Sequence, residues 1–333
     1  MDSSALGLSV VVPLYNEEAN VELLHQRLTE TLRSMAIAYE ILLVDDGSSD
    51  GTLEVAKDIC LKDPSLRVVE LRGNCGQTPA MAAGIDLARG RVIATMDGDL
   101  QNDPRDIPVM LREMDEHTHM VVGWRKNRQD KLLTRKVPSW IANRLIGKVT
   151  GVPIRDNGCS LKLYRASVIK RVPLYSEMHR FIPAMASITG ARVKEVPVMH
   201  HARQFGSSKY GLSRTYNVLL DLLAIKTIIG FAQRPLLWFG LLATPFAVAS
   251  LVALGASIWP LFGPGGELIL PYAGTGVLLG ALALFLIMGG AVGELIYATG
   301  NVDLSAYSRL LAVERVIRTP ITQGGGQQRS KDV

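Results

Sequence analysis

The chain has 333 residues, 48% of them hydrophobic, with a formal net charge of +5 and three cysteines. An odd number of cysteines without a C-x-x-C pair argues against a disulfide framework and a zinc site, and favours a reducing compartment. No recognised nucleic-acid-binding motif accompanies the positive charge, so we expect no nucleic-acid partner. The N-terminus has no basic region and no long apolar segment, so we expect no signal peptide.

In the first part of the chain, short apolar runs alternate with helix-like segments. Continuous apolar runs are typical of parallel strands that are covered on both faces. Strands that alternate with helices predict a doubly wound, mostly parallel α/β sheet. The predicted strands are residues 8–13, 40–44, 67–71, 91–96 and 120–122, and the predicted helices are residues 18–35, 49–62, 78–88 and 104–116.

Acidic and polar residues follow three of these strands. The sequence reads Leu-Tyr-Asn-Glu-Glu at 14–18, Asp-Asp-Gly-Ser-Ser-Asp at 45–50 and Asp-Gly-Asp-Leu-Gln at 97–101. Ligands of open α/β sheets bind beyond the carboxyl ends of the strands. The sequence therefore predicts a polar site at this edge of the sheet.

Asp97 and Asp99 form the strongest local signal at that edge. Two carboxylates one residue apart, with Gly98 between them, can share one hard cation that keeps water and phosphate oxygens as its other ligands. Such an ion would neutralise the charge on a leaving diphosphate. A surface turn gives the same three residues, and this alternative stays open for the motif taken alone.

Two long runs without any Asp, Glu, Lys or Arg occupy residues 235–266 and 268–293. Each exceeds the roughly 20 residues that cross a bilayer. Basic residues flank the pair, whereas the turn between the runs has none, so we expect two transmembrane helices with the head and both termini in the cytoplasm. A buried apolar hairpin in a soluble protein is the alternative.

The segments around these runs complete the predicted domain organisation. Residues 211–234 fit amphipathic helices in the membrane interface or an ordinary amphipathic core helix, and the Gly-rich tail predicts disorder. The expected parts are a cytoplasmic head at 1–210, interfacial helices at 211–234, two transmembrane helices at 235–300, and a cytoplasmic C-terminal helix with a disordered tail at 301–333.

Four motifs of the head resemble family 2 glycosyltransferases in order and spacing. They are Val-Val-Pro-Leu-Tyr-Asn-Glu-Glu at 11–18, Val-Asp-Asp-Gly-Ser-Ser-Asp-Gly-Thr at 44–52, Asn-Cys-Gly-Gln at 74–77 and Asp-Gly-Asp-Leu-Gln at 97–101. Arg-Gln-Phe-Gly-Ser-Ser-Lys-Tyr at 203–210, followed by two spans, is similar to the polyprenyl-phosphate branch: dolichyl-phosphate mannose synthases and undecaprenyl-phosphate glucose and aminoarabinose transferases. The resemblance implies a catalytic head of the GT-A type.

The resemblance also implies roles on the donor side. One group of residues would line the nucleotide base and ribose, a second would surround Mg²⁺ or Mn²⁺ and the diphosphate, and basic residues would bind the donor. These groups are Pro13, Tyr15, Glu17 and Asp46; then Asp97, Asp99 and Gln101; then Arg203 and Lys209. Taken singly, Tyr15 also fits a packing aromatic, Glu17 a helix-start carboxylate and Asp46 a turn residue.

Basic residues after the last predicted strand point to the acceptor. Guanidinium groups match phosphate oxygens well, and the resemblance assigns Arg125 and Arg135 to the acceptor phosphate, with Arg128 in the same basic cluster. A basic stripe that only touches anionic lipid is the alternative.

Asp156 matches a family aspartate that is often called the catalytic base. A phosphate monoester has a second pKa of about 6, so the attacking oxygen is mostly ionised and needs little deprotonation. We therefore expect Asp156 to position the acceptor or to stabilise positive character at the sugar, although a turn Asp before Asn-Gly gives the same pattern. The run Asp-Asn-Gly-Cys at 156–159 departs from the glucosyltransferase pattern and is closer to that of the aminoarabinose transferases, which leaves the donor sugar open.

The resemblance implies an inverting enzyme of the cytoplasmic membrane that moves a sugar, with UDP as the expected nucleotide, onto polyprenyl (undecaprenyl) phosphate. Related bacterial enzymes imply a homo-oligomer, a tetramer. Two other functions stay open, a noncatalytic nucleotide-sugar-binding scaffold and a processive polysaccharide synthase. The synthase would need more spans and a Gln-x-x-Arg-Trp motif, which the sequence lacks.

Overall fold

The computed structural model describes residues 6–126, 147, 154–172, 174, 178–188, 190–202, 234–263, 266–299 and 313–319. The chain divides into two compact units, the first formed by Met1–Asp221 with Asp303–Val333 and the second by Leu222–Val302. The predicted interfacial helices at 211–234 lie outside the described residues, apart from Arg234.

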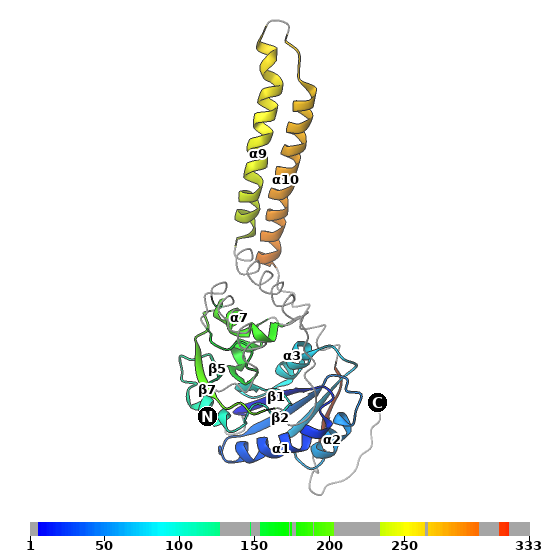
Figure 1. The fold of residues 1–333 in the computed structure, drawn as a ribbon, viewed down its shortest axis with the longest axis vertical. Helices are drawn as coiled ribbons and strands as arrows, with labels where there is room; N and C mark the ends of the chain where they lie inside the picture. The colour runs from blue at the N-terminus through cyan, green and yellow to red at the C-terminus, as the bar shows by residue number, and fades with distance from the viewer. Residues whose placement is uncertain are drawn as a thin grey trace. The chain divides into compact units, whose positions relative to one another are not determined.

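The first unit is built on an eight-stranded sheet with the order β7-β5-β6-β4-β1-β2-β3-β8 (Figure 1). β1 pairs parallel with β2 and with β4, β2 pairs parallel with β3, and β5 pairs parallel with β7. β6 lies antiparallel between β4 and β5. The predicted mostly parallel sheet is therefore confirmed, with antiparallel strands added to it. The strands are β1 (Leu8–Leu14), β2 (Tyr39–Asp45), β3 (Leu66–Leu71), β4 (Val92–Thr95), β5 (Met120–Arg125), β6 (Lys162–Arg165), β7 (Val193–Val198) and β8 (Val313–Arg318).

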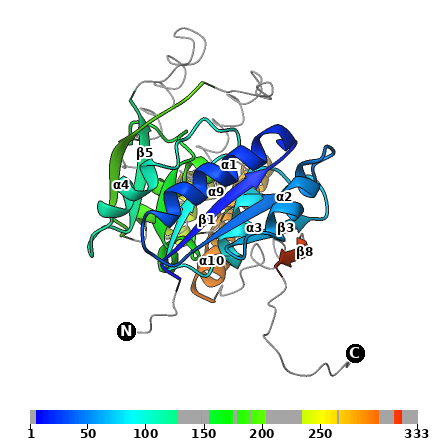
Figure 2. The same cartoon turned by 90° about the horizontal axis from the view of Figure 1, so that it is seen from below.

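Helices cover both faces of this sheet, which explains why its central strands contain runs of consecutive apolar residues. Alternate residues of a strand point to opposite faces. Val10 and Val12 pack in the core shared with the helices on one side, whereas α3 covers the other side, where Gly84 lies against Val11 and Val44. Figure 2 shows α1 and α2 in front of the sheet with α3 behind it. The helices are α1 (Glu18–Arg33), α2 (Thr52–Cys60), α3 (Gln77–Leu87), α4 (Asp106–Arg112), α6 (Ala166–Ile169) and α7 (Ile182–Ile188).

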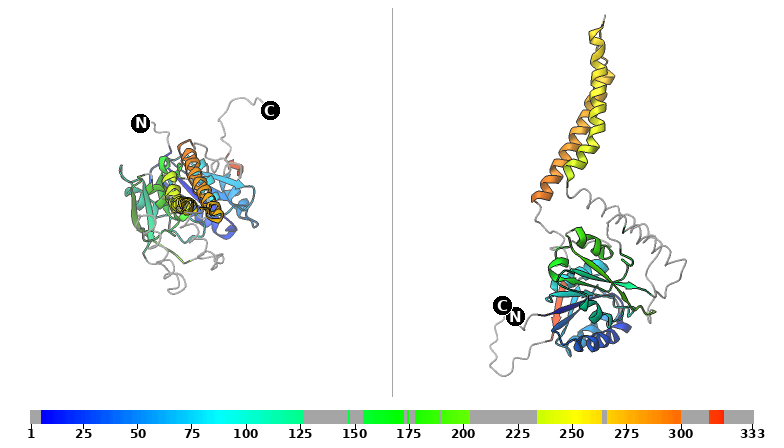
Figure 3. Two further views of the ribbon diagram at one scale, coloured as in Figure 1. Left: turned by 90° about the horizontal axis from the view of Figure 1, so that it is seen from above. Right: turned by 90° about the vertical axis from the view of Figure 1, so that its left-hand side faces the viewer.

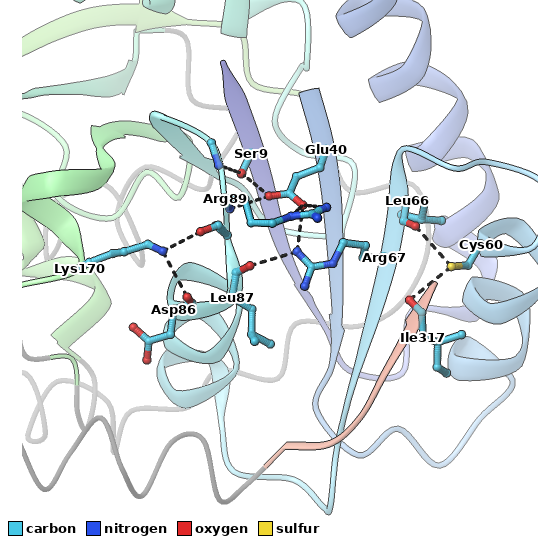
Figure 4. A network of polar contacts seen from close by, with 12 residues as sticks. Ser9, Glu40, Cys60, Leu66, Arg67, Asp86, Leu87, Arg89, Lys170 and Ile317 are labelled. Carbon is cyan, nitrogen blue, oxygen red and sulfur yellow. Dashed lines mark hydrogen bonds and ion pairs between the residues drawn. The ribbon is translucent and has the colours of Figure 1, made fainter. Parts of the chain in front are cut away.

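A buried carboxylate joins three of the central strands. Glu40 on β2 accepts hydrogen bonds from Ser9 Oγ at 2.7 Å, from Arg67 Nη1 at 2.9 Å and from Arg89 Nη2 at 2.9 Å (Figure 4). Arg67 also donates to the carbonyl of Leu87 at the end of α3. Burial acts to raise the pKa of Glu40, but these hydrogen bonds together hold it below its ordinary value. The buried charge is thus fully paired, as a charge in a protein interior requires.

The C-terminal region returns to the sheet as a strand. β8 pairs antiparallel with β3, with Val69 opposite Val316, and the carbonyl of Ile317 lies 3.6 Å from Cys60 Sγ (Figure 4). The expected C-terminal helix is therefore wrong for residues 313–318, because the β-branched run Val-Glu-Arg-Val-Ile-Arg pairs with the open edge of β3. The remainder of that expectation lies outside the described residues.

The second unit contains two long apolar helices, α9 (Pro235–Ile258) and α10 (Leu270–Thr299), joined through the short helix η3 (Trp259–Phe262). The two helices lie side by side (Figure 3). They touch through small residues: Gly280 lies against Ser250, whose Oγ donates to the carbonyl of Gly276 at 2.6 Å. In the candidate membrane-spanning stretches only 11% and 17% of the residues are buried, so most of this apolar surface is free to face lipid.

Candidate active site

A cavity of about 250 Å³ opens where the loops after β1, β2, β3 and β4 meet, at the carboxyl edge of the sheet. Six of the predicted site residues contribute to its wall. Groups that are far apart in the sequence thus meet beyond the carboxyl ends of the strands, where open α/β sheets bind their ligands. The lining residues are Pro13, Leu14, Tyr15, Glu17, Asp46, Asn74, Gly76, Gln77, Asp97, Gly98 and Asp99.

The loops after β1 and β2 are tied to each other, which fixes Tyr15 and Glu17 at the cavity. The backbone N–H of Asn16 donates to Ser48 Oγ at 3.0 Å, and the backbone N–H of Ser49 donates to Asn16 Oδ1 at 2.8 Å. Asn16 itself has a φ of 54°, a left-handed conformation that Asn tolerates better than most residues. The N–H of Glu17 donates to Thr52 Oγ1 at 2.8 Å.

Asp46 orders the loop that follows β3. Its two carboxylate oxygens accept the backbone N–H groups of Cys75, at 2.7 Å, and of Gly76, at 2.9 Å. Burial raises the pKa of Asp46, although these two hydrogen bonds act to lower it. The adjacent Gly47 has a φ of +64°, and a Cβ there would meet the backbone of Gly73 at 2.5 Å, so the close approach of the two loops requires glycine.

Asp97 and Asp99 are held by short contacts in a tight turn after β4. Gln77 Nε2 donates to Asp97 Oδ1 at 2.6 Å, and the N–H of Gln101 donates to Asp99 Oδ1 at 3.1 Å. A Cβ on Gly98 would come within 2.4 Å of Leu14 Cδ2, so a larger residue between the two carboxylates would require the Leu14 side chain to move. Leu100, fully buried, adopts a φ of 60°. A leucine in this region is strained, which is a feature of functional sites.

The cavity is acidic. Four carboxylates, those of Glu17, Asp46, Asp97 and Asp99, and no Lys or Arg belong to the described residues that line it. A nucleotide diphosphate would be repelled from such a wall unless a cation accompanied it. No group of three or more His, Cys, Asp or Glu among the described residues forms a complete metal site. Asp97 and Asp99 therefore fit a hard divalent cation that takes its remaining oxygen ligands from substrate and water.

Arg125 and Asp156 meet in a buried ion pair. Arg125 Nε donates to Asp156 Oδ2 at 2.7 Å, and Nη2 donates to Oδ1 at 2.9 Å. The two side chains are 13% and 3% exposed. The residue predicted to bind the acceptor phosphate is thus joined to the residue predicted to position the acceptor. Neither is among the described residues that line the cavity.

The remaining predicted site residues are Gln101 and four basic residues. Gln101 contributes its N–H to Asp99, but it is not among the residues that line the cavity. Its carbonyl accepts the N–H of His201 at 2.9 Å, so the chain just before the Arg203 motif runs beside the aspartate turn. Four predicted residues lie outside the described part of the chain: Arg128, Arg135, Arg203 and Lys209.

Several residues around the site received no role from the sequence. Asn74, Gly76 and Gln77 belong to the motif at 74–77 and line the cavity after β3, as the carboxyl-end rule predicts for a fourth strand. Lys162 and His179 are buried, and the sequence analysis assigned neither of them to the site. A separate cavity of about 620 Å³, lined by residues that include Arg27, Asp103 and His201, contains none of the predicted site residues.

The chain is similar in sequence to known glycosyltransferases. The family described as glycosyl transferase family 2 matches residues 9–172. Dodecaprenyl-phosphate galacturonate synthase of Rhizobium johnstonii is 47% identical over 300 residues, 89% of this chain and 89% of the relative. Undecaprenyl-phosphate 4-deoxy-4-formamido-L-arabinose transferase of Klebsiella pneumoniae is 36% identical over 333 residues, 97% of each chain.

Solved structures share the fold of the head. Glucosyl-3-phosphoglycerate synthase from Mycobacterium tuberculosis, in complex with Mn²⁺, UDP and phosphoglyceric acid, superposes with a TM-score of 0.53 at 16% identity. The match covers 67% of this chain and 80% of that one. At this identity the similarity concerns the fold alone.

Proposed function

The chain belongs to glycosyl transferase family 2, in its polyprenyl-phosphate branch, and we propose that it transfers a sugar from a UDP-sugar to undecaprenyl phosphate with inversion at the anomeric carbon. The observation that carries this proposal is the acidic cavity at the carboxyl edge of the sheet, where Asp97 and Asp99 lie together. The two polyprenyl-phosphate enzymes extend the similarity over 89% and 97% of this chain, and so include the apolar helices.

On the donor side, Asp97 and Asp99 would hold Mg²⁺ or Mn²⁺, and Tyr15, Glu17 and Asp46 would contact the base and ribose. The ion would supply positive charge for the leaving diphosphate. Gln77 keeps the Asp97 carboxylate in one orientation through its 2.6 Å hydrogen bond. Gln101, Arg203 and Lys209 complete the proposed donor site.

On the acceptor side, the lipid phosphate oxygen attacks the anomeric carbon, and the nucleotide diphosphate leaves from the opposite face. The acceptor is already ionised near neutral pH, since a phosphate monoester has a second pKa of about 6. Catalysis then depends on orientation and on the stabilisation of charge. The Arg125 and Asp156 pair would orient the acceptor, together with Arg128 and Arg135.

The apolar helices would anchor the chain in the membrane that holds its lipid substrate. α9 and α10 are each long and apolar enough to cross a membrane, and the basic residues around them favour a cytoplasmic head and cytoplasmic termini. We propose an enzyme of the cytoplasmic membrane that works as a homo-oligomer, a tetramer by resemblance.

The two relatives guide the choice of donor sugars to test. The galacturonate synthase is 47% identical and the formamido-arabinose transferase 36% identical, so UDP-galacturonic acid is the first donor to test and the formamido-arabinose donor the second. Purified full-length chain in detergent is incubated with labelled UDP- and GDP-sugars, undecaprenyl phosphate and Mn²⁺. We expect one UDP-sugar to give a lipid product whose anomeric configuration, measured by NMR, is opposite to that of the donor. Metal-dependent nucleotide binding without product from any donor would support the scaffold instead.

A further inference from the structure

A lysine side chain is buried in the middle of the sheet. Lys162, the first residue of β6, is 2% exposed and is paired across the sheet with Thr95 of β4 and with Val122 of β5. Moving an ammonium group from water into a protein interior costs several kcal/mol of free energy. An apolar residue at this position of the strand would avoid that desolvation penalty. The presence of Lys162 therefore indicates a role beyond packing.

Lys162 connects two segments that approach the site from different directions. Its Nζ donates to the carbonyl of Asn157 at 3.3 Å and to the carbonyl of His179 at 3.1 Å. Asn157 directly follows Asp156, whose carboxylate is bound by Arg125. One side of this contact therefore belongs to the acceptor half of the proposed site.

The other side leads to the donor half. His179 Nδ1 lies 2.7 Å from Thr78 Oγ1, and Thr78 directly follows Gln77, the residue that binds Asp97. Arg180 Nε donates toward His179 Nε2 at 3.5 Å, so the neutral ring carries its proton on Nδ1 and donates to Thr78. His179 is buried as well, and its burial, together with nearby Arg180 and Lys162, lowers its pKa well below the ordinary value.

The charge of Lys162 suits this position. Burial lowers the pKa of Lys162 to about 8, while the carboxylates of Asp156 and Asp97 act to raise it. The ammonium group is therefore mostly protonated at neutral pH. This positive charge is attracted to the carboxylates of both acidic residues.

We propose that Lys162, acting through His179 and Thr78, is a positioning residue that holds the Gln77 and Asp97 pair in register with the Arg125 and Asp156 pair. This inference rests on the proposed function, because register between the halves matters only when donor and acceptor react with each other. A displacement of about 1 Å between reacting groups can cost about 100-fold in rate. Lys162 would accordingly affect the chemical step more than the binding of either substrate.

The test compares Lys162→Met, Lys162→Arg and Thr78→Val with wild type in the full-length chain. Lys162→Met keeps the length of the side chain but removes its charge and donors, and Thr78→Val removes one hydrogen bond with little change in volume. The control is Arg67→Met, which removes a buried cation of the same sheet that pairs with Glu40 (Figure 4) and does not line the cavity. Thermal unfolding is measured for each variant, so that rates refer to folded protein.

We expect Lys162→Met to lower kcat about 100-fold with donor and acceptor KM within about threefold of wild type, and Thr78→Val to lower kcat about tenfold. Lys162→Arg should recover part of the lost rate, and Arg67→Met should lose stability without losing kcat. Equal kcat in wild type, Lys162→Met and Thr78→Val would overturn the inference while leaving the proposed function standing. Wild type that forms no lipid product would overturn the proposed function itself. If Lys162→Met does not fold, Thr78→Val alone decides.

Discussion

The guanidinium of Arg125 donates two parallel hydrogen bonds to the carboxylate of Asp156, of 2.7 Å and 2.9 Å. Bidentate pairs of this kind fix the orientation of both groups. Each carboxylate oxygen already accepts a charged donor, so the geometry favours a group that orients its surroundings over one that removes a proton. Arg125 lies at the end of β5, and Asp156 lies 31 residues further along the chain.

Asp156→Asn should lower kcat about 100- to 1,000-fold, the range found when one group that stabilises a transition state is removed. The amide keeps the shape of the carboxylate but loses its charge and one of its acceptors. If the reaction requires an ionised acceptor phosphate and no proton removal by Asp156, kcat of both enzymes should fall below a pH of about 6. The measurement is kcat against pH for wild type and variant, and a variant rate that no longer depends on pH would identify Asp156 as the base.

Asp99→Asn should weaken the binding of Mn²⁺ in the presence of UDP by about 100-fold, or about 2.7 kcal/mol. The reason is that only Asp97 would then remain as a charged ligand in the turn after β4. Isothermal titration of the full-length chain with Mn²⁺ and UDP measures this without turnover. The matched control is Asp103→Asn, which changes a buried aspartate paired with Arg105 and His201 in the separate cavity. Equal loss in both variants would argue against a metal site at Asp99.

Asp46→Ala should raise the donor KM about tenfold, which corresponds to about 1.4 kcal/mol. The carboxylate accepts the N–H groups of Cys75 and Gly76, so its removal releases the loop that forms one wall of the cavity. Acceptor KM should stay the same. Initial rates at varied donor and fixed acceptor give the result, with Asp58→Ala on the exposed face of α2 as the control. An unchanged donor KM would remove Asp46 from the donor site.

Glu40→Gln should lower the free energy of unfolding by about 3 kcal/mol at neutral pH, because it leaves the buried guanidinium of Arg67 without its carboxylate partner. The pKa of Glu40 is lowered in the folded protein from an ordinary value of 4.5. Its contribution is therefore complete above that pH and is lost as the pH falls through the lower folded value.

Thermal unfolding of wild type and Glu40→Gln in detergent, compared at neutral pH and at successively lower pH, tests this prediction. The difference in the free energy of unfolding between wild type and Glu40→Gln should become smaller as the pH falls. Glu22→Gln, on the exposed face of α1, should differ little from wild type at any pH. A constant difference for Glu40→Gln across the pH range would show that Glu40 is not ionised in the folded chain.

The central strands were predictable because each contains a run of consecutive apolar residues, as expected for a sheet that is covered on both faces. The same pattern placed Asp46, Asp97 and Asp99 at one edge, where the cavity lies. β6 was not predictable in this way, because Lys162 interrupts its apolar pattern and its partners β4 and β5 come from far away in the chain.

Long-range pairing also explains the other differences. β8 is a short run with little local signal, and only the free edge of β3 makes it a strand. The contact between Arg125 and Asp156 joins groups from separate segments, each of which reads as part of a basic or polar loop when taken alone. Local patterns therefore brought the predicted donor residues to one cavity, but they gave no sign of the contact between Arg125 and Asp156.

The most direct test of the proposed reaction is its stoichiometry. Full-length wild type is given a labelled UDP-sugar, undecaprenyl phosphate and Mn²⁺, and released UDP and lipid-linked sugar are measured in the same sample, with Asp99→Asn and a chelated sample alongside. The proposal predicts one lipid-linked sugar for each UDP released, strongly reduced amounts of both products with Asp99→Asn, and neither product in the chelated sample. Release of UDP without lipid-linked sugar, or lipid product that persists after the metal is removed, would contradict it.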